Sequence, residues 1–234
     1  MKVNDIVAIK NGGKLSIIAR NQSDLASVST IIGDLNSKDG IEKICSQIEN
    51  EDWDILINLA GVQYFGFFEN QAPEHLYESM YVNLLAPIRL IQSVLPRMKA
   101  RSFGQIVNIG SIFGSINFAH FATYSSAKSG LRGLSQSLRR ELAATPIGVT
   151  YVAPRAVNTP FNSAKVQELK KLTKMNMDEP ELVASRIIKA IERDEKDVFI
   201  GNPESFFVRL NGLFPSLVDG ALRSKDILTA SLFK

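Results

Sequence analysis

Short runs of β-branched and other apolar residues recur along almost the whole chain, separated by segments with helical spacing. This alternation constrains the fold most, because it is typical of a parallel sheet whose strands are joined by crossover helices. Most of the runs are nearly continuous, as expected for strands covered on both faces. They predict strands at Ile6–Ile9, Leu15–Ala19, Thr30–Ile32, Asp54–Asn58, Gln105–Gly110, Gly148–Ala153 and Val198–Ile200.

Three longer segments carry apolar residues at helical spacing and predict helices from Glu74 to Ala100, from Ala122 to Ala143 and from Pro180 to Arg193. No internal repeat or linker divides the chain, and 234 residues suit one well-packed core. We therefore expect a single α/β domain over residues 1–234, with a Rossmann-type doubly wound sheet. That sheet should have seven mainly parallel strands and helices on both faces.

Two connections are too short for this arrangement. Parallel neighbours need a crossover of about a dozen residues or more, yet only Lys10-Asn11-Gly12-Gly13-Lys14 separates Ile9 from Leu15. The link between Ala19 and Thr30 is also short. The segment from Lys10 to Gly13 resembles the end of a helix with its glycine stop, without the helix that should precede it. We infer that residues are missing after about Ile9 and near Ser27; a gene product with true deletions is the alternative.

Composition argues against several kinds of partner. The 27 basic and 24 acidic side chains are interspersed and leave a net charge of +3, which favours neither nucleic acid nor an anionic membrane surface. The single cysteine, Cys45, fits a reducing compartment and a small buried side chain. No stretch approaches the roughly 20 apolar residues that cross a bilayer, and the first residues lack a signal core. We expect a cytoplasmic protein without a metal site, because His75 and His120 have no ligand partners at suitable spacing.

Polar residues with complementary chemistry follow the predicted strands. Tyr124 and Lys128 are four residues apart, which places them on one face of a helix. A phenol titrates near pH 10, so an acid/base tyrosine needs its anion stabilised, and a nearby ammonium does this. Ser111 directly follows a strand and can hydrogen-bond a substrate oxygen. Each feature alone is common, but their order and their placement at strand ends make the combination far more specific, and it indicates acid/base chemistry by Tyr124.

This constellation resembles the short-chain dehydrogenase/reductase family, from about Ile6 to Ile200. The resemblance rests on Asn58-Leu59-Ala60-Gly61, on Asn83 within Tyr81-Val82-Asn83-Leu84, on Ser111, and on Tyr124 with Lys128. It implies a proton relay of Asn83, Ser111, Tyr124 and Lys128, with Tyr124 as the acid/base. In that relay Lys128 also holds the nicotinamide ribose, and Asn83 anchors a water behind the lysine.

Other segments resemble the family's cofactor contacts. Asp34-Leu35 matches the position that contacts adenine. The segment Pro154-Arg155-Ala156-Val157-Asn158-Thr159 resembles the family's Pro-Gly-x-Val-x-Thr, whose Val and Thr meet the nicotinamide carboxamide, and Arg155 stands where glycine is usual. The cofactor-binding residues implied in this way are Asp34, Leu35, Asn58, Ala60, Gly61, Tyr124, Lys128, Pro154, Val157 and Thr159.

The largest departure from the family is the phosphate loop. The family's Thr-Gly-x-x-x-Gly-x-Gly run should follow Ile9, and Gly12-Gly13 does not provide it. Cofactor choice can still be argued from the end of the second strand, where Arg20 stands and no acid is present. An arginine there suits a 2′-phosphate, whereas an acid would take the ribose hydroxyls of NAD. We therefore favour NADP(H) over NAD(H).

Substrate choice should depend on the stretches after the strand ends, which are apolar. A hydrophobic pocket is expected from Gln63-Tyr64-Phe65, Ile112-Phe113, Phe118, Phe121, Phe161, Met175 and Met177. Residues 161–178 carry few order signals and are predicted to form a lid over the substrate. The apolar tail, residues 203–234, needs cover from the substrate opening, a second subunit or a membrane surface, of which the low net charge disfavours the membrane.

These features predict an NADP(H)-dependent oxidoreductase that interconverts a carbonyl and an alcohol on an apolar small molecule. A 3-oxoacyl thioester reductase is an alternative, with Arg97 and Arg101 as weak candidates for a basic patch near the opening. A catalytically silent nucleotide-binding or scaffold protein is an alternative of another class, if the glycine-rich loop is truly absent. The family resemblance also implies a homodimer or homotetramer packed through the helices predicted at Glu74–Ala100 and Ala122–Ala143.

Overall fold

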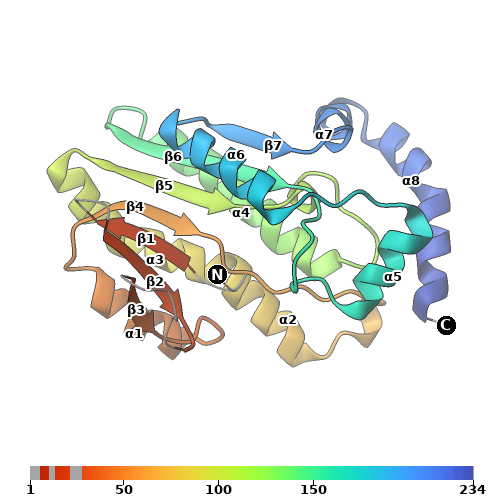
Figure 1. Ribbon diagram of the computed structural model, residues 1–234, viewed down its shortest axis with the longest axis horizontal. Helices are drawn as coiled ribbons and strands as arrows, with labels where there is room; N and C mark the ends of the chain where they lie inside the picture. The colour runs from red at the N-terminus through yellow and green to blue at the C-terminus, as the bar shows by residue number, and fades with distance from the viewer. Residues whose placement is uncertain (1–5, 11–13, 22–27, 234) are drawn as a thin grey trace.

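The computed structural model describes residues 6–10, 14–21 and 28–233. These residues form a seven-stranded sheet in the order β3-β2-β1-β4-β5-β6-β7, with helices packed around it (Figure 1). Each predicted strand is present, and no strand end differs from its predicted position by more than one residue. The strands are β1 Ile6–Lys10, β2 Lys14–Ala19, β3 Ser29–Ile32, β4 Trp53–Asn58, β5 Gly104–Ile109, β6 Ile147–Pro154 and β7 Asp197–Ile200.

The α-helices of the described chain are α1 Lys38–Ile48, α2 Pro73–Met80, α3 Ala86–Arg101, α4 Ala122–Glu141, α5 Ala164–Thr173, α6 Pro180–Glu192, α7 Glu204–Leu213 and α8 Pro215–Ala230. The predicted helix from Glu74 to Ala100 is interrupted by a π-helical turn at Tyr81–Leu85. Pro87 explains the interruption, because it has no N–H to donate to the carbonyl of Asn83 and its ring crowds that carbonyl.

Strand β1 runs antiparallel to both of its neighbours, β2 and β4. The other neighbouring pairs, β2–β3, β4–β5, β5–β6 and β6–β7, are parallel. Lys10 and Lys14 are register partners, so the short link between β1 and β2 is met by reversing the chain rather than by a crossover. Residues 11–13 and 22–27, where the sequence predicts missing segments, lie outside the described part of the chain.

Helices cover both faces of the sheet, as predicted. Successive strand residues point to opposite faces, and neighbours on β5 accordingly enter different cores. Ile106 packs in a buried cluster with residues of α1, α3 and the end of α4. Val107 packs with Val183 and Ala190 of α6. These two cores hold β4, β5 and β6 rigidly, and the carboxyl ends of those strands therefore provide fixed positions for side chains.

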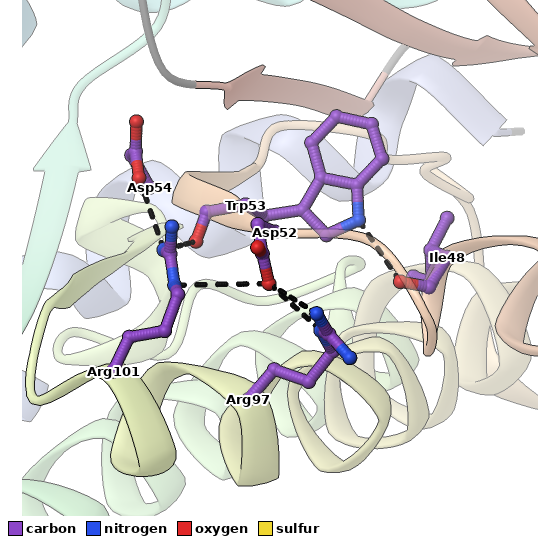
Figure 2. Close-up of polar contacts among 6 residues, drawn as sticks. All are labelled: Ile48, Asp52, Trp53, Asp54, Arg97 and Arg101. Atoms are coloured by element: carbon purple, nitrogen blue, oxygen red, sulfur yellow. Dashed lines mark hydrogen bonds and ion pairs between the residues drawn. The ribbon is translucent and has the colours of Figure 1, made fainter.

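Arg97 and Arg101, near the end of α3, lie at the amino end of β4, and Figure 2 shows their partners. Arg97 forms a 2.7 Å ion pair with Asp52, and Arg101 forms a 3.0 Å ion pair with Asp54. Arg101 also donates to the carbonyl of Trp53 at 2.8 Å. The expectation that these arginines form a basic patch near the opening is wrong, because acidic residues at the opposite edge of the sheet bind them.

The predicted lid contains an unexpected helix, α5. The Ser163 side chain accepts a hydrogen bond from the backbone N–H of Val166 and begins the helix, and Lys174 ends it in a left-handed conformation. The apolar tail forms α7 and α8, and α8 lies beside α5 at the end of the molecule (Figure 1). The tail thus covers the region beyond the strand ends. Over the described residues, no helix has the length and apolar character needed to cross a membrane.

Candidate active site

A cavity of about 490 Å³ lies at the carboxyl ends of β4, β5 and β6. The site is at this edge because parallel strands deliver their following residues to the same side of the sheet. Several residues predicted from the sequence line this cavity: Gly61, Ser111, Tyr124, Lys128, Pro154, Val157 and Thr159. Residues that are far apart in the chain therefore meet at one place.

Ser111 follows β5 and begins the short 3-10 helix Ile112–Gly114. Its hydroxyl accepts a hydrogen bond from the backbone N–H of Phe113 at 3.1 Å, which fixes the turn. Gly110 precedes it, and a Cβ there would lie 2.2 Å from the hydroxyl of the buried Tyr151. The Tyr151 hydroxyl in turn donates to the Ser111 carbonyl at 3.4 Å. Only glycine at position 110 leaves room for this support beneath Ser111.

Tyr124 lies in the first turn of α4 and is only 7% exposed. Burial raises the pKa of its phenol to about 12, and a hydrogen bond with the Ser111 side chain opposes that rise. The rings of Phe113 and Phe161 lie 6.1 Å and 6.3 Å from the Tyr124 ring between centroids. The phenol therefore points into an aromatic environment in which its neutral form is strongly favoured.

Lys128 lies one helical turn after Tyr124, and its Nζ is 5.8 Å from the centre of the Tyr124 ring. This side chain is 3% exposed, and its ammonium donates to the carbonyl of Ile109 at 2.9 Å. Burial lowers the pKa of the Lys128 amine to about 8. The sequence predicted that the ammonium would lower the pKa of Tyr124; in the protein alone, desolvation of both groups dominates instead.

Asn83 is fully buried in the π-helical turn and faces the loop that follows β4. Its amide nitrogen donates to the carbonyls of Val62 and Ser79, each at 2.8 Å, and its Oδ1 accepts from the N–H of Val62 at 3.2 Å. A Cβ on Gly61 would lie 3.0 Å from that Oδ1 and 3.8 Å from the Lys128 Nζ. Asn83 thus fixes the loop beside Lys128 through the backbone.

Asn58 and Ala60 are buried and do not line the cavity. The Asn58 amide donates to Asn108 Oδ1 at 2.8 Å, and Asn108 donates to the Ser135 hydroxyl at 2.9 Å. This chain of hydrogen bonds joins β4, β5 and α4 beneath the site. Asn108 was missed in the sequence, although a polar residue inside an apolar strand is a usable signal for a buried network.

Arg20, Asp34 and Leu35 lie together at the ends of β2 and β3, where they line a small cavity of about 30 Å³. Arg20 and Asp34 are exposed, and Leu35 is buried. Val62 also lines this cavity, and the neighbouring Gly61 lines the larger one. The two groups of predicted cofactor residues are therefore linked through the loop that follows β4.

The predicted apolar pocket is present but is divided. Gln63, Phe113, Phe121, Phe161 and Met175 line the 490 Å³ cavity. Phe65 and Met177 pack against the cluster behind Phe121, and Ile112 and Phe118 line a neighbouring cavity. Tyr64 stacks on His75, and His120 contacts aromatic rings instead of metal ligands. No group of residues suited to a metal ion occurs in the part of the chain that the structure describes.

Arg155, at the family's usual glycine position, is the centre of a polar cluster that the sequence did not predict. Its guanidinium pairs with Asp178 at 2.6 Å and with Glu204 at 3.0 Å, and it donates to the Asn202 carbonyl at 2.9 Å. Asp178 ends the predicted lid, and Glu204 begins α7. Helix α6 also contributes to the cavity through Glu181, Ala184 and Ile187, and no local pattern in the sequence indicated that role.

Comparison with known proteins matches residues 5–170 to the family model described as short chain dehydrogenase. A 3-oxoacyl-[acyl-carrier-protein] reductase of Haemophilus influenzae is 32% identical over 65% of this chain and 67% of its own length. The 3-ketodihydrosphingosine reductase of Bos taurus is 27% identical over 98% of this chain and 76% of its own length. A short-chain dehydrogenase from Sphingobium yanoikuyae in complex with NADPH superimposes with a TM-score of 0.69 at 25% identity, covering 82% of this chain and 76% of that chain.

The chain is short relative to these proteins. It spans between 52% and 67% of the length of four of the curated relatives that it matches. The match to the bovine protein extends over 256 positions, more than the 234 residues present here. The aligned stretch of that relative therefore includes positions that have no counterpart in this chain.

Proposed function

This chain belongs to the short chain dehydrogenase family, and on that basis we propose that it interconverts a carbonyl and an alcohol on a hydrophobic small molecule with NADP(H). Tyr124 is the proton donor and acceptor in this proposal. The observation that carries it is the convergence of Ser111, Tyr124 and Lys128 in one largely apolar cavity. A scaffold protein has no physical need for these three groups at one place, which argues against the catalytically silent alternative.

The nicotinamide half of the cofactor fits the residues at this site. Gly61 has no side chain beside the Lys128 Nζ, and a Cβ there would fill the space between Lys128 and Asn83. Lys128 would hold the nicotinamide ribose, and Val157 and Thr159, which line the same cavity, would meet the carboxamide. When bound, the nicotinamide supplies or accepts the hydride.

The pyrophosphate half fits less well. A dinucleotide pyrophosphate is normally bound at the N-terminus of a helix that follows the first strand. Here β1 pairs directly with β2 in antiparallel register, and three residues separate Lys10 from Lys14 in this chain. The described residues of this chain therefore show no helix that begins directly after β1. We therefore propose that the chain binds the cofactor mainly through its nicotinamide end, with a smaller contribution from the Arg20 cavity.

Ser111 and Tyr124 have different roles in the proposed proton transfer. The Ser111 hydroxyl hydrogen-bonds the substrate oxygen and sets its position relative to Tyr124. In reduction, Tyr124 donates its phenolic proton to that oxygen; in oxidation, it takes the proton back. Burial raises the pKa of Tyr124 to about 12, so the phenol is protonated at neutral pH. This protonation state favours reduction of a carbonyl.

The preference for NADP(H) is supported by Arg20, which is exposed at the end of β2 beside Leu35. A guanidinium there can pair with a 2′-phosphate. Arg20→Ala should lower kcat/KM for NADPH to the value for NADH, whereas Arg140→Ala, an exposed change on α4, should alter neither. Equal kcat/KM for the two cofactors in the wild-type protein would contradict the preference.

Among substrates, an apolar carbonyl compound is better supported than an acyl-carrier thioester. A thioester reductase would need basic residues near the opening to bind an acidic carrier. The two candidate arginines pair with Asp52 and Asp54 at the other edge of the sheet, and the exposed lysines nearer the opening, Lys174 and Lys225, line the neighbouring cavity and not the one that holds Tyr124. The name of the bovine relative indicates a lipid-like ketone as its substrate, in agreement with the aromatic walls of this site.

The proposal is tested by following NADPH oxidation with a panel of hydrophobic ketones and aldehydes. Tyr124→Phe should reduce turnover by about 100-fold to 10,000-fold, the usual contribution of a positioned general acid, with an unchanged circular dichroism spectrum. The matched control is Tyr77→Phe on α2, where the phenol is 61% exposed. Full turnover by Tyr124→Phe would remove this residue from the mechanism, and an inactive wild type across the panel would support the catalytically silent alternative.

A further inference from the structure

A second cavity, of about 290 Å³, adjoins the 490 Å³ site cavity. We call it the distal cavity. It is enclosed by the segment after β5 together with α5, α7 and α8, and α5 and α8 lie side by side at this end of the molecule (Figure 1). Five residues line both cavities and form the wall that they share: Phe113, Phe121, Arg155, Ala156 and Met175.

The walls of the distal cavity are suited to an uncharged guest. Most of its buried surface comes from aliphatic and aromatic side chains, namely Ile112, Ile116, Phe118, Leu169, Val218 and Leu222. Of its charged lining residues, Arg155 and Glu204 pair with each other at 3.0 Å, and Asp226 on α8 is a partly buried carboxyl whose pKa is raised by burial, which favours its neutral form. Lys174 and Lys225 are exposed and thus lie toward the solvent side. An aliphatic group inside would gain contacts without displacing any of these charges.

We propose that the distal cavity holds the aliphatic tail of the substrate, so that the enzyme acts on long-chain carbonyl compounds or the corresponding alcohols. This inference rests on the proposed function, because it takes the reacting carbon to lie beside Tyr124. From that point an extended molecule reaches the shared wall at Phe113 and Phe121, both of which line the site cavity with Tyr124. The tail continues past this wall into the distal cavity.

The shared wall favours a flexible chain over a rigid polycyclic substrate. The Phe113 ring stacks on Phe118 at 4.6 Å and meets the edge of Phe121 at 4.9 Å, measured between centroids. These rings hold each other in place, whereas Met175 beside them has a side chain that adapts its shape easily. A chain that can bend passes such a wall more readily than fused rings, which remain confined to the site cavity.

Chain length gives the first test. Burial of each methylene should raise kcat/KM by about fourfold, and the site cavity alone accepts short ketones. With NADPH, the wild-type protein should therefore prefer 2-dodecanone over 2-butanone strongly, through a lower KM. A flat series of kcat/KM values from 2-butanone to 2-dodecanone would overturn the proposal.

Two variants fill the distal cavity from opposite walls. Ala221→Trp places an indole on α8, and Thr173→Trp places one at the end of α5; neither residue lines the site cavity. Each should lower kcat/KM for 2-dodecanone by about tenfold, which corresponds to the contribution of about two methylenes, with the loss confined to long ketones. The control is Ala100→Trp, an exposed change on α3 that lines neither cavity.

Calorimetry of decan-1-ol binding without cofactor tests the tail site independently of the proposed reaction. The wild type and Ala100→Trp should bind the alcohol, and the two cavity-filling variants should bind it at least about tenfold more weakly. If no ketone is reduced but this pattern of binding holds, the proposed reaction is wrong and the tail site stands. If the wild type does not bind decan-1-ol, or if both cavity-filling variants bind it normally, the tail site is refuted.

Discussion

At the scale of single residues, the site is defined by two ionisable groups whose charged forms are disfavoured by burial. The pKa of Tyr124 is raised to about 12 and that of Lys128 is lowered to about 8. In the protein alone, both groups are therefore close to their neutral forms over part of the accessible pH range. In the proposed complex, a bound cofactor and substrate would add hydrogen bonds to Tyr124 and Lys128. Burial of these two groups would then serve catalysis at a cost to stability.

Lys128→Met should make the protein more stable and inactive. The pKa of Lys128 in the folded protein is about 8, below its ordinary value of 10.5. Folding stability therefore rises with pH between these values and is lowest below pH 8, where the buried amine carries its charge. At pH 7 the variant should gain on the order of 2 kcal/mol in the free energy of unfolding, as expected when a buried ion is replaced by an apolar group.

Urea unfolding at several pH values measures this effect. The wild type should become more stable from pH 8 to pH 10, and Lys128→Met should lack that increase. Lys189→Met, an exposed change on α6, serves as the control and should follow the wild type. A variant that is less stable than the wild type at pH 7 would show that Lys128 stabilises the fold.

The sequence identified Ser111, Tyr124 and Lys128, which converge in one cavity, but it did not indicate the pKa values of Tyr124 and Lys128. Tyr124 and Lys128 are recognisable because their spacing fixes them on one helix face. Their burial depends on Phe113, Phe161 and the loop after β4, which come from distant parts of the chain. No local pattern in the sequence indicates how deeply these side chains are buried. The sequence therefore could not show that desolvation raises the pKa of Tyr124 more than the Lys128 ammonium lowers it.

At the scale of elements, Arg155 joins three segments around the cavities. It lies just after β6, pairs with Asp178 at the end of the predicted lid, and pairs with Glu204 at the start of α7. The Arg155 side chain also packs against the backbone of Gly201. A Cβ at position 201 would lie 2.5 Å from the Arg155 Cδ, so a larger residue there would clash with the arginine. The residue that departs from the family pattern therefore joins segments that line the two cavities.

Arg155→Met should lower the free energy of unfolding by about 2 kcal/mol, because it leaves two partly buried carboxylates without their partner. Arg155→Lys should restore only part of this loss, since an ammonium cannot form the paired hydrogen bonds with Asp178. Thermal unfolding gives both values, with Arg193→Met at an exposed position as the control. Equal stability of Arg155→Lys and the wild type would exclude a specific role for the guanidinium.

The elements themselves were largely predictable. The strand positions followed from apolar runs, and α4 and α6 followed from their helical spacing. The π-helical turn at Tyr81–Leu85 and the helix α5 were not foreseen. The π-helical turn depends on Pro87, and the start of α5 depends on Ser163. The hydrophobic pattern of the surrounding segments does not change with either residue, so it did not reveal their effects.

At the scale of the whole molecule, one half of the sheet matches the family and the other half departs from it. Strands β4 to β7 are parallel and carry the candidate active site at their carboxyl ends. Strand β1 is reversed and pairs directly with β2, where a helix is expected in a dinucleotide-binding fold. The sequence predicted an irregularity here, because the link after Ile9 is too short for a crossover, and we interpreted it as missing residues. The length of the link did not predict that β1 runs antiparallel to β2.

This division predicts a weak contribution of the adenosine half to cofactor binding. NADPH should bind less than about tenfold more tightly than reduced nicotinamide mononucleotide, a difference below about 1.4 kcal/mol. The reason is that β1 pairs directly with β2, and the described residues offer no helix N-terminus after β1 for the pyrophosphate. Calorimetric titration with the two compounds gives the ratio directly. A ratio of several hundredfold would show that the chain holds the adenosine half by other means.

The central claim is that the cavity around Ser111, Tyr124 and Lys128 performs a reduction. Its most direct test uses NADPH with both hydrogens at C4 of the nicotinamide replaced by deuterium, a long-chain ketone as substrate, and mass spectrometry of the product. We predict an alcohol one mass unit heavier, with the deuterium on the carbinol carbon, formed by the wild type and lost in Tyr124→Phe. An alcohol without deuterium, or equal rates of formation of labelled alcohol by the wild type and the variant, would contradict the claim.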